Sequence, residues 1–325
     1  MMAYNDGDSL EEYILLVLSD SNLPTGGFVA SSGLESFWAH GLLQMLGSQW
    51  STNGTSTSSE QLVAFISASL DTYGHLIAGF LQDVHRIVYE YMHSTSQDAS
   101  SSLAFVAEKV ERLDIALHAM MLNHVAQRAS KAQGIALLTL YAKSFAPIPN
   151  GQETSNSYDR LSIQASKRGY ALLQEIKSRI RRGSSHGHLP ICWAAFMAAL
   201  GVDSSEKALA MHMFLQARAI LSSAVRLNIV GPYLSHRLLA FEVKQIIQRS
   251  MVQVKNCTSG LLVEQGKEEV QPGSKFNANF DWDWHDDGQS DDGRSPSQNL
   301  PKTTWPLGDL LQARHDQLHS RLFNS

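Results

Sequence analysis

Apolar residues recur every three or four positions along most of the chain, which is the periodicity of amphipathic helices. The clearest stripe starts at Leu62 and predicts a helix of about eight turns; its members are Leu62, Ile66, Ser69, Tyr73, Ile77, Phe80, Val84, Val88 and Tyr91. A second stripe runs through Val106, Val110, Leu113, Leu117, Met120 and His124. Two further helices are expected over residues 130–145 and 161–181.

The second half of the chain shows stop and start signals between its apolar segments. A turn over 183–190 precedes an apolar helix over 191–200, Gly201 is a plausible stop, and residues 203–206 resemble the start of a capping box. Gly231-Pro232 ends the following helix, and residues 234–254 predict one more. No window shows the two-residue alternation of strands. The pattern predicts an all-α protein with a single helical-bundle domain.

Three polar segments interrupt this pattern: residues 47–60, 94–102 and 255–304. They hold too few apolar residues to offset the entropy lost when a chain is ordered. We therefore expect a helical domain over 1–254 with flexible loops near 47–60 and 94–102, and a disordered linker over 255–304. Residues 305–325 regain helical spacing. They predict a C-terminal docking segment whose apolar face has no fixed place on the bundle.

The charge distribution narrows the choice of partners. The net charge is −5, and residues 263–302 hold nine acidic and four basic residues, so this segment accounts for the whole imbalance. A neutral helical domain argues against binding to nucleic acid and favours recognition by shape and apolar contact. The two cysteines, Cys192 and Cys257, fit neither a disulfide scaffold nor a zinc motif. With no signal peptide and no expected membrane span, we predict a cytoplasmic protein that does not bind membranes.

A tight turn is predicted at Leu23-Pro24-Thr25-Gly26-Gly27-Phe28. The glycines allow backbone conformations in which other side chains would clash. A phosphate-binding loop would need a lysine followed by Ser or Thr, and none follows here. We interpret Pro24, Gly26 and Gly27 as a structural turn that positions helices.

No catalytic motif is present. The histidines are the residues that could bind a metal ion. His186 and His188 are the best pair, yet no third ligand stands nearby in register. An ordinary exposed loop is favoured over a nickel or zinc site. A direct metal carrier or a helical enzyme that uses these two histidines stays as the alternative.

Two arginines lie on one face of the helix expected before Gly231. Arg218 and Arg226 are spaced two turns apart within an apolar stretch, and buried arginines must be paired. Glu35, near the start of another helix, is the candidate partner. A structural ion pair and a contact with another protein are equally good interpretations.

Four motifs in the same order resemble the urease accessory protein F (UreF) family. They are Leu23-Pro24-x-Gly26-Gly27-Phe28-x-x-Ser31-x-Gly33-Leu34-Glu35, then Arg128-x-Ser130-x-x-Gln133-Gly134, then Ala224-Val225-Arg226-Leu227 before Gly231, and finally Arg314-His315 followed by Arg321-Leu322-Phe323-x-Ser325. The sequence departs from the family at Pro232-Tyr233 and in its long polar insertion. The insertion suggests a eukaryotic member, fungal or algal.

The resemblance implies an all-helical nickel-insertion chaperone without catalytic residues, which acts in the maturation of urease. It implies three partners: the protein called UreD or UreH, the GTPase UreG, and apo-urease. The chain would form a homodimer and bind no cofactor tightly, because nickel is handled by the complex. We expect the partner-binding residues to be Glu35, Arg218, Arg226, Arg314, His315, Arg321, Leu322 and Phe323.

Overall fold

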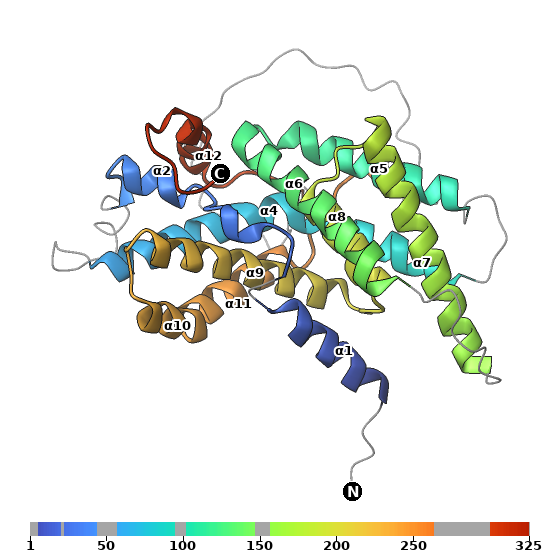
Figure 1. Cartoon of the computed structure of the whole chain (residues 1–325). Helices are drawn as coiled ribbons and strands as arrows, with labels where there is room; N and C mark the ends of the chain where they lie inside the picture. Colours follow the sequence, from blue (N-terminus) through green and yellow to red (C-terminus); the bar gives the residue numbers. More distant parts are fainter. Residues whose placement is uncertain are drawn as a thin grey trace, which may run out of the picture.

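The computed structural model describes residues 6–20, 23–43, 57–94, 102–146, 157–262 and 300–324, and all regular secondary structure within them is helical, as predicted (Figure 1). The α-helices are α1 (Asp6–Leu18), α2 (Leu34–Ala39), α4 (Ser58–His93), α5 (Leu103–Met120), α6 (His124–Leu140), α7 (Ser157–Arg182), α8 (Leu189–Ala199), α9 (Ser205–Arg226), α10 (Pro232–Ala240), α11 (Glu242–Val254) and α12 (Pro306–Ala313). Short helical turns are η1 (Gly27–Val29), η3 (Tyr141–Phe145) and η5 (Arg314–Gln317).

Helix α4 is the centre of the bundle and packs against α5, α7, α8, α9 and α11. Its N-terminus is fixed by a capping box, in which Thr57 Oγ1 accepts from the Glu60 amide and Glu60 Oε2 accepts from the Thr57 amide. The helix therefore starts inside the segment that was predicted to be a loop over 47–60. Residues 47–56 of that segment lie outside the described residues.

Helix α8 is buried on every side, from Pro190 to Ala199. An apolar surface around the whole helix is typical of a helix enclosed by others, and α8 contacts α4, α6, α7 and α9. The indole of Trp193 finds its partner inside the core, because Nε1 donates to the Ala208 carbonyl at 2.9 Å. The helical-bundle prediction is confirmed by this arrangement.

Some helix boundaries differ from those predicted. The stripe from Val106 to His124 is interrupted, because α5 ends at Met120 and Asn123 caps α6 by accepting from two backbone amides. The single helix expected over 234–254 is two helices that bend at Phe241 (φ −117°, ψ −68°). Helix α1 was not predicted.

The ends of the predicted linker are packed against the bundle. Asp83 Oδ2 accepts from the Ser259 amide at 2.8 Å, and the hydroxyls of Thr72 and Thr304 lie 2.7 Å apart. The chain can pass this closely because α4 carries Gly79, where a Cβ atom would stand 2.3 Å from the Thr258 carbonyl carbon. The prediction of a disordered linker is wrong for 255–262 and 300–304, and residues 263–299 lie outside the described part of the chain.

Helices α4 and α9 are long and apolar enough to cross a membrane, although the sequence was predicted to contain no such stretch. About half of the apolar window of each is buried inside the fold, at 56% and 50%. Core helices of soluble proteins also combine this length and composition, so the finding is weak evidence for a membrane span.

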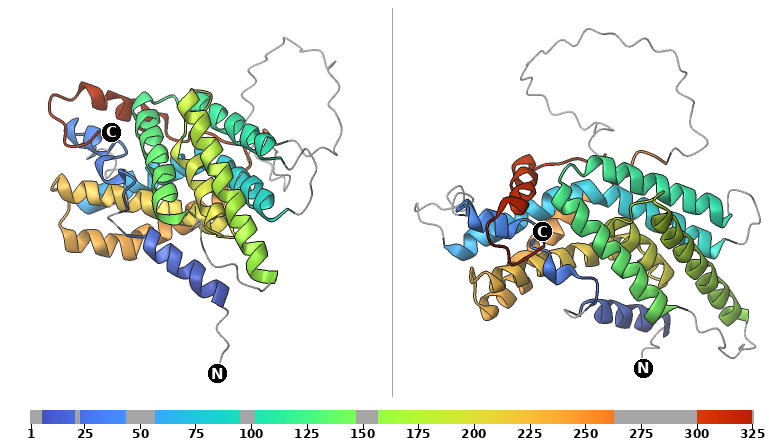
Figure 2. Two further views of the ribbon diagram at one scale, coloured as in Figure 1. Left: turned by 45° about the vertical axis from the view of Figure 1, so that its right-hand side comes forward. Right: turned by 45° about the horizontal axis from the view of Figure 1, so that its top comes forward.

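The C-terminal segment lies on the bundle beside α2 and α6 (Figure 2). The ring of Trp305 lies 5.0 Å from Phe37 and 5.8 Å from Phe65, measured between centroids. Leu311 and Phe323 are buried. The expectation that this segment has no fixed place is wrong, because its apolar side chains complete a core on α2 and α4.

Candidate functional site

The four family-like motifs, which are far apart in the sequence, meet around the C-terminal segment. The first motif forms the turn before α2, where Gly26 has φ +75° and Gly33 has φ +85°. The left-handed conformation at Gly26 agrees with its predicted role in a structural turn. Gly27 has no positive φ, but a Cβ atom there would stand 3.4 Å from Gln133 Oε1 of the second motif. Pro24 lies exposed in the same turn.

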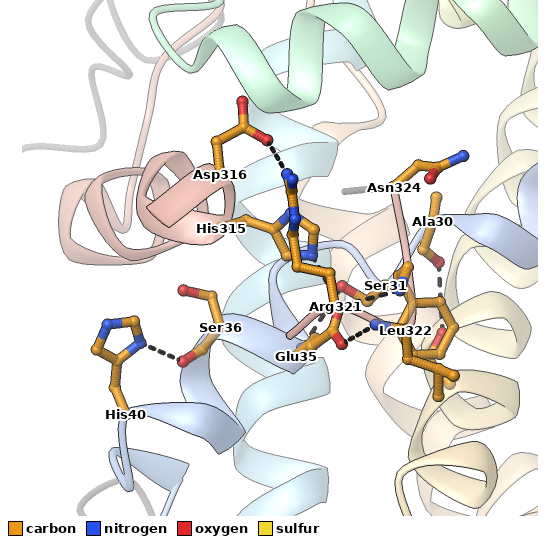
Figure 3. Close-up of polar contacts among 12 residues, drawn as sticks. Ala30, Ser31, Glu35, Ser36, His40, His315, Asp316, Arg321, Leu322 and Asn324 are labelled. Carbon is orange, nitrogen blue, oxygen red and sulfur yellow. Dashed lines mark hydrogen bonds and ion pairs between the residues drawn. The ribbon is translucent and has the colours of Figure 1, made fainter. Parts of the chain in front are cut away.

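Glu35 is the buried acceptor that holds the C-terminal segment (Figure 3). Its Oε2 lies 2.7 Å from Nε2 of His315 and accepts from the Phe323 amide at 3.1 Å. Its Oε1 accepts from the Leu322 amide at 2.5 Å. Carboxylates are buried only when they are paired and hydrogen-bonded. The predicted arginine partner is therefore wrong, and His315 with two backbone amides takes that place.

Both predicted arginines of α9 hold the N-terminal segment. Arg226 donates to the Phe28 carbonyl, and its guanidinium lies over the ring of Phe323 at 4.4 Å from the centroid. Arg218 donates to the carbonyls of Ser19 and Asp20. Partial burial lowers the pKa of both guanidinium groups. Arg226 thus joins the first, third and fourth motifs at one point.

A second clamp holds the C-terminal segment to α6. Arg128 donates to both carboxylate oxygens of Asp316, at 2.9 Å and 2.8 Å, and also to the Asn324 carbonyl. Arg321 donates to the same carboxylate at 3.0 Å (Figure 3), and His124 lies 3.3 Å from it. The hydrogen bond from Arg128 holds the pKa of Asp316 well below its usual range. Arg128 belongs to the second motif and Asp316 directly follows Arg314-His315 of the fourth, but sequence spacing gave no sign of their pairing.

Ser130 and Gly134 of the second motif hold the loop before α8. Ser130 Oγ accepts from the Leu189 amide at 3.0 Å and lies 3.2 Å from Nδ1 of His188. Gly134 is needed for close approach, since a Cβ atom there would stand 2.2 Å from the Gly187 carbonyl oxygen. One face of α6 therefore contacts the C-terminal segment and the loop before α8.

The candidate metal ligands belong to this buried loop. His188 is fully buried, and its Nε2 lies 3.0 Å from Nδ1 of His118. Burial lowers the pKa of His188 to about 4. His186 stacks on His118, with ring centroids 3.7 Å apart. The expectation of an ordinary exposed loop is wrong for His188, because its side chain is fully buried. Both of its ring nitrogens face protein groups.

Asp114 fixes the backbone of this loop. Its fully buried carboxylate accepts from the Ser185 hydroxyl and from the amides of His186, Gly187 and His188, at 2.6–3.0 Å. This carboxylate was missed by the sequence analysis, because its partners follow it by more than 70 residues. Within the described ranges, no group of three or more His, Cys, Asp and Glu residues is arranged to hold a metal ion.

An open groove of about 920 Å³ runs between η1, α6 and the C-terminal segment. Its lining includes Thr25, Gly26, Arg128, Gln133, Arg321 and Phe323. Leu322 is 59% exposed at its edge, whereas Phe323 is 3% exposed and belongs to the core. Arg314 is exposed, with Nε 3.4 Å from Gln317 Oε1. Predicted partner-binding residues thus divide into buried ones (Glu35, His315 and Phe323) and accessible ones.

The fold and the site define a class of protein: an all-helical bundle in which four motifs hold a C-terminal segment on the body. The comparisons identify the family. The model of the UreF family matches residues 56–241. Urease accessory protein 6 of Cryptococcus neoformans var. grubii is 35% identical over the full length of both chains. The chain belongs to the UreF family.

More distant relatives come from plants and from another fungus. Urease accessory protein F of Oryza sativa subsp. indica is 27% identical and covers 94% of this chain and 82% of its own length. An uncharacterized UreF-like protein of Schizosaccharomyces pombe is 22% identical over 97% of each chain. The predicted eukaryotic branch of the family is therefore supported.

Proposed function

We propose that this chain is a non-catalytic accessory protein that helps to insert nickel into urease, as a scaffold for UreD/UreH and the GTPase UreG. Its membership of the UreF family and the names of its relatives as urease accessory proteins support a role in urease maturation. The first motif forms a turn that lacks the lysine of a phosphate-binding loop. Nucleotide hydrolysis is thus assigned to the separate GTPase.

The scaffold role rests on one observation, the exposed apolar side chains on the outer surface of the C-terminal segment. Its inner contacts through Glu35 and Asp316 fix it on the bundle, while Leu307, Leu310 and Leu322 are 55%, 66% and 59% exposed. Leu307 and Leu310 follow each other by three residues on α12, so they share one face. We call these three leucines with Arg314 the tail face, and assign it to UreD/UreH.

Apolar side chains at the centre of such a face supply affinity, and a cation at its edge supplies orientation. Nickel is cargo in this proposal and is not assigned to residues of this chain. The geometry does not favour the carrier that uses His186 and His188, because His188 is buried with both nitrogens engaged.

The test is reconstitution with UreD/UreH, UreG, apo-urease and nickel. Leu310→Asp combined with Leu322→Asp should reduce recovery of UreD/UreH on this chain at least tenfold and abolish urease activation. Val252→Asp on α11 is the matched control, since Val252 is a 79% exposed apolar side chain away from α12 (Figure 1). The control variant should still recover UreD/UreH and should still support urease activation. Thermal melting should verify that each variant is folded.

Normal UreD/UreH recovery by the double variant would remove the tail face from the proposal. Failure of the wild-type chain to increase urease activation would remove the accessory role itself. We further propose that the chain acts in the cytoplasm as a homodimer. Light scattering should then give twice the monomer mass of 35.9 kDa.

A further inference from the structure

A cavity of about 120 Å³ lies beneath α12, and it shares Ala30, Ala129 and Gln133 with the groove described above. Its lining includes four aromatic residues, Phe37, Phe65, Tyr73 and Trp305, together with Met120, Met121 and several neutral polar side chains. A cavity of about 150 Å³ in another protein accepts benzene. This cavity is therefore close to the size needed for a guanidinium or a short alkylammonium group.

Asp309 is the one charged residue among the described residues that line this cavity. Its carboxylate is half-buried and has neither a hydrogen bond nor an ion pair with any described residue. Burial raises the pKa of this carboxyl group. Two of the amides that line the cavity are engaged elsewhere, since Asn123 Nδ2 donates to Gln312 Oε1 and Gln216 Nε2 donates to Ser32 Oγ.

A structural role at the start of α12 explains only part of this arrangement. Asp309 lies in the first turn of that helix, where a carboxylate interacts favourably with the helix dipole. An exposed carboxylate would serve that role equally well, without the cost of partial burial among aromatic rings. The carboxylate is still partly exposed, so a ligand can reach it and offset the cost of its partial burial.

We propose that this cavity binds an ammonium or guanidinium group, which pairs with Asp309 and lies against the aromatic rings. A cation gains from a carboxylate by a charge-assisted hydrogen bond and from aromatic faces by cation–π attraction. Two sources offer this chemistry: a small free amine, and a lysine or arginine side chain of a protein. Either would stabilise the folded position of α12, because the cavity exists only when that helix is seated.

The first experiment compares n-butylammonium chloride with n-butanol, a neutral molecule of similar shape, at equal ionic strength. On the full chain, the ammonium should raise the melting temperature by about 2–4 °C at roughly ten times its Kd, and the alcohol should not. Asp309→Asn should abolish this rise, and Asp309→Glu should retain it. Asp203→Asn removes a 60% exposed carboxylate before α9 and should leave the rise unchanged.

Equal shifts with the ammonium and the alcohol, or no shift with either, would overturn the proposal using the wild-type protein alone. An unchanged shift in Asp309→Asn would overturn the role of that carboxylate. The source is identified with capped tripeptides that carry lysine or norleucine at the centre. Binding of the lysine peptide alone assigns the site to a protein side chain, and binding of butylammonium without the lysine peptide assigns it to a free amine.

Discussion

At the scale of single residues, Glu35 is the buried side chain that holds the C-terminal segment to α2. Its two oxygens have three partners, the imidazole of His315 and the amides of Leu322 and Phe323. Hydrogen bonds to a charged acceptor are stronger than those to a neutral one, and a buried group left without its partner costs the most. The position therefore requires a negative charge rather than only a polar group.

Replacing Glu35 with Gln should lower the free energy of unfolding by about 2–3 kcal/mol. The glutamine amide has a donor where the carboxylate has an acceptor, so one of the Leu322 and Phe323 amides loses its bond. Urea unfolding measures the loss, and hydrogen exchange at these two amides should become faster. Glu108→Gln is the control, because Glu108 is 50% exposed and pairs with Arg112 on the surface; its effect should stay below about 0.5 kcal/mol.

His188 is a second residue whose protonation state affects the fold. Its pKa is lowered by burial to about 4, from 6.5. Between these two values the unfolded chain binds more protons at this site than the folded chain does. The free energy of unfolding should therefore decrease as the pH falls from about 6.5 to about 4, by up to roughly 3 kcal/mol from this residue.

Urea unfolding across this pH range tests the effect. His188→Gln should be less stable at pH 7.5 but should lose less stability on acidification. The exposed His93 offers a control, and His93→Gln should follow the wild-type pH dependence. The buried His212, with a pKa lowered to about 3, contributes to the slope of every variant. Identical slopes for wild type and His188→Gln would contradict the assignment.

At the scale of elements, α6 connects two parts of the site through one motif. Arg128 reaches the C-terminal segment, while Ser130 and Gly134 hold the loop before α8. The loop is held from its other side by Asp114 of α5. The spacing of the motif thus reflects two contacts made by one helix.

Gly134→Ala should lower the free energy of unfolding by about 1–3 kcal/mol. The added Cβ atom overlaps the backbone carbonyl of Gly187, which cannot rotate away as a side chain could. Gly231→Ala is the matched control. Its φ is −76°, and no heavy atom lies within 4 Å of the added group. Chemical unfolding should separate the two variants clearly. Equal stability would mean that the loop at Gly187 moves without cost.

At the scale of the whole molecule, the C-terminal segment is a component of the core. Removing residues 305–325 exposes Phe37 and Phe65 to water and removes the three groups that bind the Glu35 carboxylate. We therefore expect a fall in melting temperature of several degrees. Each fully buried large apolar side chain contributes about 1.5–3 kcal/mol.

Differential scanning calorimetry of chain 1–304 against the full chain measures this fall. Shortening the acidic segment 263–299 by half is the control. It removes no contact among the described residues, and the entropy of loop closure changes slowly with length. An unchanged melting temperature for chain 1–304 would show that the segment is only loosely attached.

The sequence by itself determined the helical class, most of the helices and the family. Apolar periodicity is a local property, and a residue such as Gly26 reveals a turn through its own backbone preference. The four motifs were also visible, because they are short and contiguous. Their shared location was not, since nothing local to Arg128 indicates that its partner is Asp316.

Only the tertiary structure decided which groups pair and which segments are packed. Periodicity showed that residues after Trp305 have an apolar face, but not that α2 and α4 supply its partner surface. Composition marked 255–262 as a linker, although a glycine in α4, at Gly79, gives that backbone room to pack. Glu35 was matched with Arg226 by charge alone. In the fold a carboxylate meets whichever donors the packing of helices brings to it, and here these were His315 and two backbone amides.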